Sequence, residues 1–74
     1  MAADDQAERE REFHELSGAA DVLTLLREEF EQWLEEAQDD SKQEALANVL
    51  GHIESMEIQY TQRRDEAHER LQSA

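Results

Sequence analysis

The feature that most constrains this chain is a heptad pattern of apolar residues between Leu46 and Ala67. Apolar side chains there recur at alternating steps of three and four residues. One core position is taken by Leu46, Ile53, Tyr60 and Ala67, and the other by Val49, Met56 and the single polar residue Arg63. Such spacing is typical of an α-helix that packs one face along another helix. The pattern predicts a long helix with one contact seam.

A second seam of the same kind lies upstream. It comprises Leu16, Ala19, Leu23, Leu26, Phe30, Trp33 and Ala37. Ser17-Gly18 is the one place where this first helix could break, because glycine in a helix interior costs about 1 kcal/mol. However, the seam keeps its phase on both sides of the glycine, which favours one continuous helix, straight or bent at that point.

A short polar turn separates the two patterns. Asp39-Asp40-Ser41 precedes the second seam, and Ser41 with Glu44 forms a capping box of the type S-x-x-E. Because the turn is short, the two helices should be antiparallel neighbours. We expect one all-α domain over residues 1–74, with a helix over about 6–38, a turn at 39–41 and a helix over about 42–71. Trp33 should then lie opposite Val49, and Leu26 opposite Met56.

One hairpin cannot cover all the apolar residues of this chain. Several lie beside or behind the predicted seam, and burying each is worth roughly 1.5–3 kcal/mol. We take four of them as candidate interaction residues: Leu25, Leu34, Leu50 and Ile58. Two hairpins paired into a dimeric four-helix bundle would cover them, and two-fold dimers are the commonest oligomers. A different protein could cover the same surface instead.

Charge and composition limit the partners. The formal net charge is −13, which opposes direct binding to nucleic acid phosphates or to an anionic membrane surface. There is no cysteine, and no apolar run approaches the roughly 18 residues that a membrane span needs. We expect a cytoplasmic protein that forms a homo-oligomer and binds a protein partner.

Motifs of catalysis and phosphate binding are absent from the sequence. His14 and His68 take outward heptad positions and should be solvated. His52 flanks the seam on the same side as Glu29, so these two side chains could meet. Glu57 is well placed to pair with Arg27. No cofactor is expected, and the candidates for a metal site are Glu29, Glu57 and His52.

The iron alternative depends on a resemblance. A glutamate on one helix and Glu-x-x-His on the next is the ligand pattern of ferritin-like proteins. The half-length hairpin and the L-x-E-E sequence at Leu26–Glu29 resemble encapsulated ferritins, whose two-helix subunits assemble a metal site across a dimer. The resemblance implies iron bound by Glu29 and Glu57 at a subunit interface. Tyr60, however, stands where the pattern has histidine.

The residues taken together favour a non-catalytic function. We expect a small acidic helical protein that self-associates and binds a protein partner, as an adaptor, an inhibitor or a chaperone-like module. A ferritin-like half-bundle is the alternative.

Overall fold

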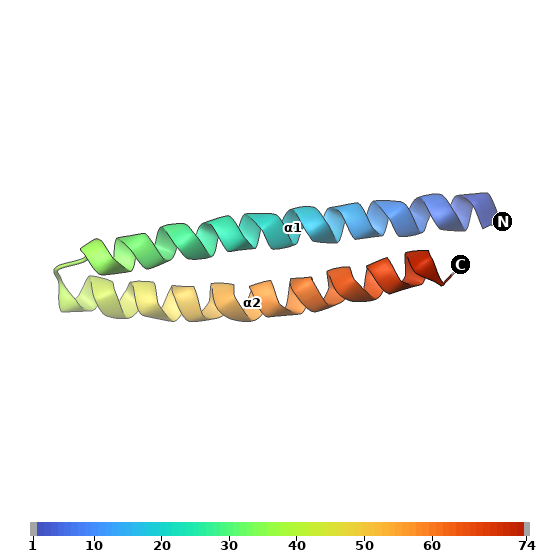
Figure 1. The fold of residues 1–74 in the computed structure, drawn as a ribbon. Coiled ribbons are helices and arrows are strands. Elements are labelled where there is room, and N and C mark those ends of the chain that lie inside the picture. Colours follow the sequence, from blue (N-terminus) through green and yellow to red (C-terminus); the bar gives the residue numbers. More distant parts are fainter. Residues whose placement is uncertain (1, 74) are drawn as a thin grey trace.

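The protein is an antiparallel helical hairpin. A computed structural model describes residues 2–73, with side chains from Asp5 onward; Met1 and Ala74 lie outside the described residues. Helix α1 spans Ala2–Glu36 and helix α2 spans Asp40–Gln72. The loop lies at one end and both termini at the other (Figure 1). Within residues 2–73, neither helix has a stretch long and apolar enough to cross a membrane.

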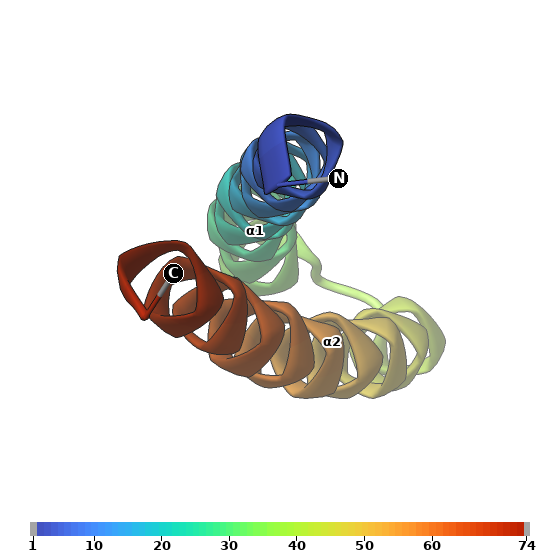
Figure 2. The same ribbon diagram turned by 90° about the vertical axis from the view of Figure 1, so that its right-hand side faces the viewer.

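The first helix is continuous through Ser17-Gly18, as the unbroken seam predicted. It begins four residues earlier than expected, at Ala2. The two helices are inclined to each other when the molecule is viewed from its open end (Figure 2). The chain contains no proline, so nothing in its composition forces a break in either helix.

The turn is capped differently from the prediction. Asp39, not Ser41, is the N-cap of α2: its backbone is extended, and its carboxylate accepts from the Ser41 backbone nitrogen at 3.4 Å. The predicted capping box therefore lies inside the first turn of α2. An aspartate at the cap also interacts favourably with the positive end of the helix dipole. Across the loop, Gln43 Nε2 donates to the Ala37 carbonyl at 2.7 Å and so caps the end of α1.

Compared with the seam predicted from the sequence, every second residue of the observed contact seam is shifted by one position along the chain. Its buried or half-buried members are Phe13, Leu16, Ala20, Leu23, Arg27, Phe30 and Leu34 on α1, Ala37 directly after α1, and Leu46, Leu50, Ile53, Glu57, Tyr60, Arg64, Ala67 and Leu71 on α2. The sequence-based assignment was therefore wrong for five exposed residues, Leu26, Trp33, Val49, Met56 and Arg63, whereas Ala19 is half-buried as expected of a seam residue. It was also wrong to leave Leu34 and Leu50 outside the seam.

The physical reason is that the apolar residues of each helix fall into three rows, each made of positions seven residues apart. One neighbouring helix can cover only two such rows. Both seams share one row, which contains Leu23 and Ile53. The predicted seam added the more apolar of the two remaining rows. The hairpin adds the other one instead, which brings Arg27 and Glu57 together between the helices. One apolar row of each helix is consequently left at the side of the hairpin.

The core of the single chain is thin. Its buried apolar residues are Ala20, Leu23, Leu50, Ile53 and Ala67. The molecule measures 57 × 14 × 13 Å, with a radius of gyration of 16.8 Å. A compact domain of this length would have a radius of gyration of about 11 Å. The hairpin is thus a rod two helices wide, without a third layer to cover its sides.

Candidate functional site

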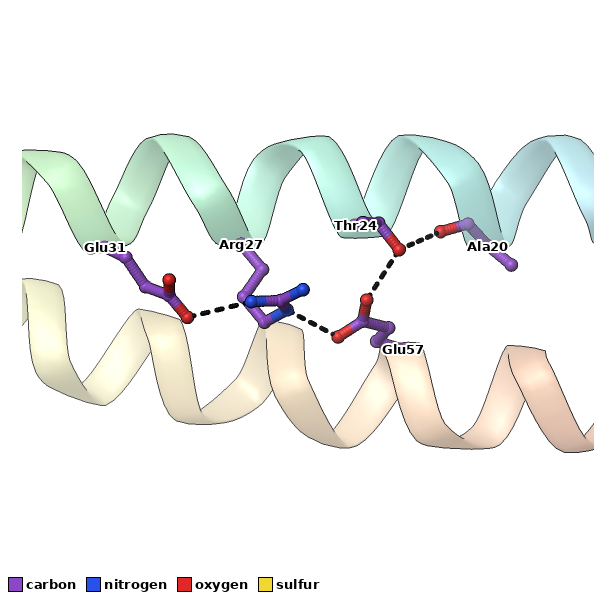
Figure 3. A network of polar contacts seen from close by, with 5 residues as sticks. All are labelled: Ala20, Thr24, Arg27, Glu31 and Glu57. Carbon is purple, nitrogen blue, oxygen red and sulfur yellow. Dashed lines mark hydrogen bonds and ion pairs between the residues drawn. The ribbon is translucent and has the colours of Figure 1, made fainter.

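A polar cluster joins the two helices near the middle of the seam (Figure 3). Arg27 Nε donates to Glu57 Oε1 at 2.8 Å, and Arg27 Nη1 donates to Glu31 Oε1 at 3.0 Å. The Thr24 hydroxyl donates to Glu57 Oε2 at 2.6 Å and lies 3.1 Å from the carbonyl oxygen of Ala20. The predicted pairing of Arg27 with Glu57 is confirmed. Glu57, the only member from α2, thereby uses both carboxylate oxygens.

The cluster keeps its charges at neutral pH. The hydrogen bond from Thr24 lowers the pKa of Glu57, and the Arg27 guanidinium lowers it further, against the opposing effect of partial burial. The carboxylates of Glu31 and Glu57 raise the pKa of Arg27. A charged pair between two helices keeps its hydrogen bonds only when the helices are correctly aligned along their length. Misalignment would leave a half-buried charge without its partner. The cluster therefore helps to fix the register of the hairpin.

The predicted metal ligands are not gathered in one place. Glu57 is engaged with Thr24 and Arg27, while Glu29 and His52 are exposed. Among the residues that the structure describes, no group of three or more histidine, aspartate or glutamate side chains is arranged to hold a metal ion. Iron binding by Glu57 would compete with the hydrogen bonds that its two carboxylate oxygens accept from Thr24 and Arg27.

An apolar stripe runs along one side of the hairpin. Its four members, Leu26, Trp33, Val49 and Met56, are between 36% and 49% exposed, and we call them the lateral stripe. Each precedes a seam residue by one position, and the members on each helix are seven residues apart, so they form one row per helix. Reversal of one helix in an antiparallel pair brings these two rows to the same side.

Contacts elsewhere in the hairpin fix the levels at which the two rows meet. Arg70 Nη2 donates to Glu12 at 2.7 Å near the open end, and Arg27 pairs with Glu57 at the middle. In this register Trp33 lies at the level of Val49, and Leu26 at the level of Met56, the levels that the sequence predicted. The Trp33 ring packs edge-on against Phe30 of the seam, with centroids 5.0 Å apart. The stripe is therefore continuous with the core.

The four predicted interaction residues fall into two groups. Leu25 and Ile58 are 60% and 61% exposed. Leu50 is buried and Leu34 half-buried, and both contribute to the hairpin itself. The exposed Val22, four residues before Leu26, extends the stripe on α1, whereas Leu25 lies on the outer face of the helix, away from the seam. Ile58 lies on a different face of α2, because it follows a seam residue rather than preceding one.

Sequence reasoning placed the stripe residues in the seam and so missed them as an exposed surface. The signal that could have found this surface was the width of the apolar pattern, which covers three rows of each helix. A two-row seam accounts for a helix pair, whereas a third apolar row is typical of a helix that contacts two neighbours.

The open end carries an aromatic contact in place of a large core. Phe13 lies with its ring centroid 5.4 Å from that of His68 on α2 and 5.6 Å from that of His14. Both histidines are exposed, as predicted, although each has one side against Phe13. Residues 2–73 form no pocket. The side chains available for recognition therefore lie on the outer surface.

The lateral stripe, flanked by acidic helix faces, is the surface that this arrangement offers for binding. Comparison with known proteins gives no further assignment, since no protein-family model, no curated protein and no solved structure matches this chain.

Proposed function

We propose that this protein is a non-catalytic helical module that self-associates into a dimeric four-helix bundle and binds a protein partner. The observation that carries the proposal is the lateral stripe, which includes the only tryptophan of the chain. Tryptophan and methionine are enriched at protein interfaces. An apolar row continuous with a thin core is what each half of a four-helix bundle presents to the other.

The exposed area of the single chain supports this proposal. The hairpin exposes 5551 Å² for a mass of 8.6 kDa. A compact monomer of that mass would expose about 4,700 Å². The excess is about 850 Å², close to the roughly 800 Å² that each partner buries in a standard protein interface. Pairing along one side would therefore bring the surface to the value of a compact protein.

The charge of the chain indicates the kind of partner. Its net charge of −13 makes the outer faces of the proposed bundle strongly acidic. Complementary charge speeds association and suppresses wrong partners. The proposed partner is a protein with a basic surface, and Ile58, exposed on the outer face of α2, supplies an apolar anchor for it. Such binding fits an adaptor, an inhibitor or a chaperone-like module.

Self-association is tested by light scattering after size exclusion over a range of dilutions. We expect twice the chain mass at micromolar concentration. Met56→Glu places a charge in the lateral stripe and should give the single-chain mass. Ile58→Glu is the matched control, because it adds the same charge to the same helix outside the stripe and should stay dimeric. A single-chain mass for the unmodified protein at every concentration would refute self-association.

Partner binding is tested with the protein immobilised in native extract. We expect retention of a basic protein that elutes at high salt, and loss of that retention with Ile58→Ser. Serine is chosen because an added carboxylate would itself attract a basic partner. Leu50→Ser would not be a suitable control, since Leu50 is part of the core. Equal retention by Ile58→Ser would remove Ile58 from the binding surface.

A further inference from the structure

The lateral stripe is uneven along its length. Its large residues, Leu26 and Trp33 on α1 and Val49 and Met56 on α2, all lie in the half of the hairpin next to the loop. In the half next to the termini, the same two rows hold Ala19 and Arg63. The apolar area available to a second copy is therefore concentrated at one end.

From this asymmetry we infer that the second copy packs on the lateral stripe with its loop at the same end, each α1 lying against the partner's α2. The inference rests on the proposed self-association and adds to it the surface and the orientation of the copies. In this arrangement Trp33 lies near the partner's Val49, and Leu26 near the partner's Met56. The two copies then enclose one continuous apolar cluster.

The other two-fold arrangement of two hairpins puts the loops at opposite ends. Each α1 then lies against the partner's α1, and each α2 against the partner's α2. Trp33 would oppose Ala19 of the other copy, and Val49 would oppose its Arg63. In that register Leu26 and Met56 would each oppose their own counterpart, but Trp33 and Val49 would meet a small and a charged residue, so less apolar surface would be removed from water.

Charges beside the stripe favour the same orientation. The row four residues before the stripe on α1 holds Glu15, Val22, Glu29 and Glu36, and the corresponding row on α2 holds Ala45, His52, Gln59 and Glu66; all eight are exposed. With loops at the same end, Glu29 lies at the level of the partner's His52. With loops at opposite ends, the register that sets Trp33 against Ala19 puts Glu29 at the level of Val22 of the other copy, so Glu29 has no histidine partner there.

The orientation is tested by one distance between the two copies. The chain has no cysteine, so Ser41→Cys provides a single attachment point for a nitroxide label in the loop. The Ser41 side chain is exposed, and only its backbone nitrogen takes part in the cap. Pulsed dipolar electron spin resonance should give a loop-to-loop distance of about 15–30 Å, because helices in a bundle pack roughly 10 Å apart. Loops at opposite ends would give a distance approaching the 57 Å length of the hairpin.

Two further measurements separate the possible failures. Ser73→Cys, at the open end, should also give a short distance, and Met56→Glu in the loop-labelled protein should abolish the dipolar signal. A long loop distance would overturn the orientation while leaving self-association in place. A short distance that persists with Met56→Glu would overturn the stripe as the interface. The absence of any dipolar signal, together with a single-chain mass, would overturn both the inference and the proposed self-association.

Discussion

Two isoleucines of α2 differ in burial and allow a matched test of the seam. Ile53 is 5% exposed and Ile58 is 61% exposed. The assigned seam therefore predicts that Ile53→Ala destabilises the protein strongly and that Ile58→Ala does not. Both substitutions remove the same three carbon atoms from the same helix, so helix propensity cancels in the comparison.

The magnitude follows from the buried carbons. At about 0.8 kcal/mol for each buried methylene, three carbons give about 2.4 kcal/mol for Ile53, and an unfilled cavity raises the cost to between about 2 and 5 kcal/mol. A chain of this length has a total stability of roughly 4–11 kcal/mol. For Ile58, the smaller loss of burial is partly offset by the better helix propensity of alanine, so we expect a change within about 0.5 kcal/mol.

Thermal unfolding followed by circular dichroism checks the prediction. A loss of 2.4 kcal/mol corresponds to a lowering of Tm by about 10–20 °C in a domain of this size. All variants are compared at one protein concentration, because the Tm of a dimer depends on concentration. Equal lowering of Tm by the two substitutions, or a larger effect of Ile58→Ala, would refute the assigned seam.

Three further predictions concern the polar cluster, the glycines and the tightest core position. The lowered pKa of Glu57 means that its ionised form stabilises the fold above the ordinary carboxyl pKa of 4.5, and that this stabilisation is lost as the pH falls through the lowered value. In urea unfolding at neutral pH, Glu57→Gln should thus have a lower free energy of unfolding than the unmodified protein, and this difference should disappear in acid. A difference that does not depend on pH would contradict this. Gly51→Ala and Gly18→Ala should each stabilise the protein by about 0.5–1 kcal/mol, because a Cβ added at either position meets nothing within 4 Å. If light scattering shows weaker self-association for Gly51→Ala, Gly51 lies in an interface instead. Ala67→Leu should cost about 1–3 kcal/mol in urea unfolding because Ala67 is 1% exposed; the exposed Ala47→Leu is its control, and equal effects would show that Ala67 is not tightly packed.

The sequence by itself determined the hairpin and its register. Heptad spacing on both sides of one short polar turn requires two long antiparallel helices, and a glycine that leaves the phase intact does not break a helix. The levels at which Trp33 meets Val49 and Leu26 meets Met56 follow from the length of the turn alone. The pairing of Arg27 with Glu57 could likewise be predicted, because opposite charges on facing helices at neighbouring levels attract.

Only the tertiary structure decided which two of three apolar rows face each other. Apolar periodicity measures how wide the apolar side of a helix is, and it does not state which part of that width the neighbouring helix covers. Leu34 and Leu50 lie inside the seam. Leu26, Trp33, Val49 and Met56 lie beside it, because the helices are rotated to bring Arg27 and Glu57 between them. That rotation places the lateral stripe at the surface, and the spacing of apolar residues along one helix does not determine it.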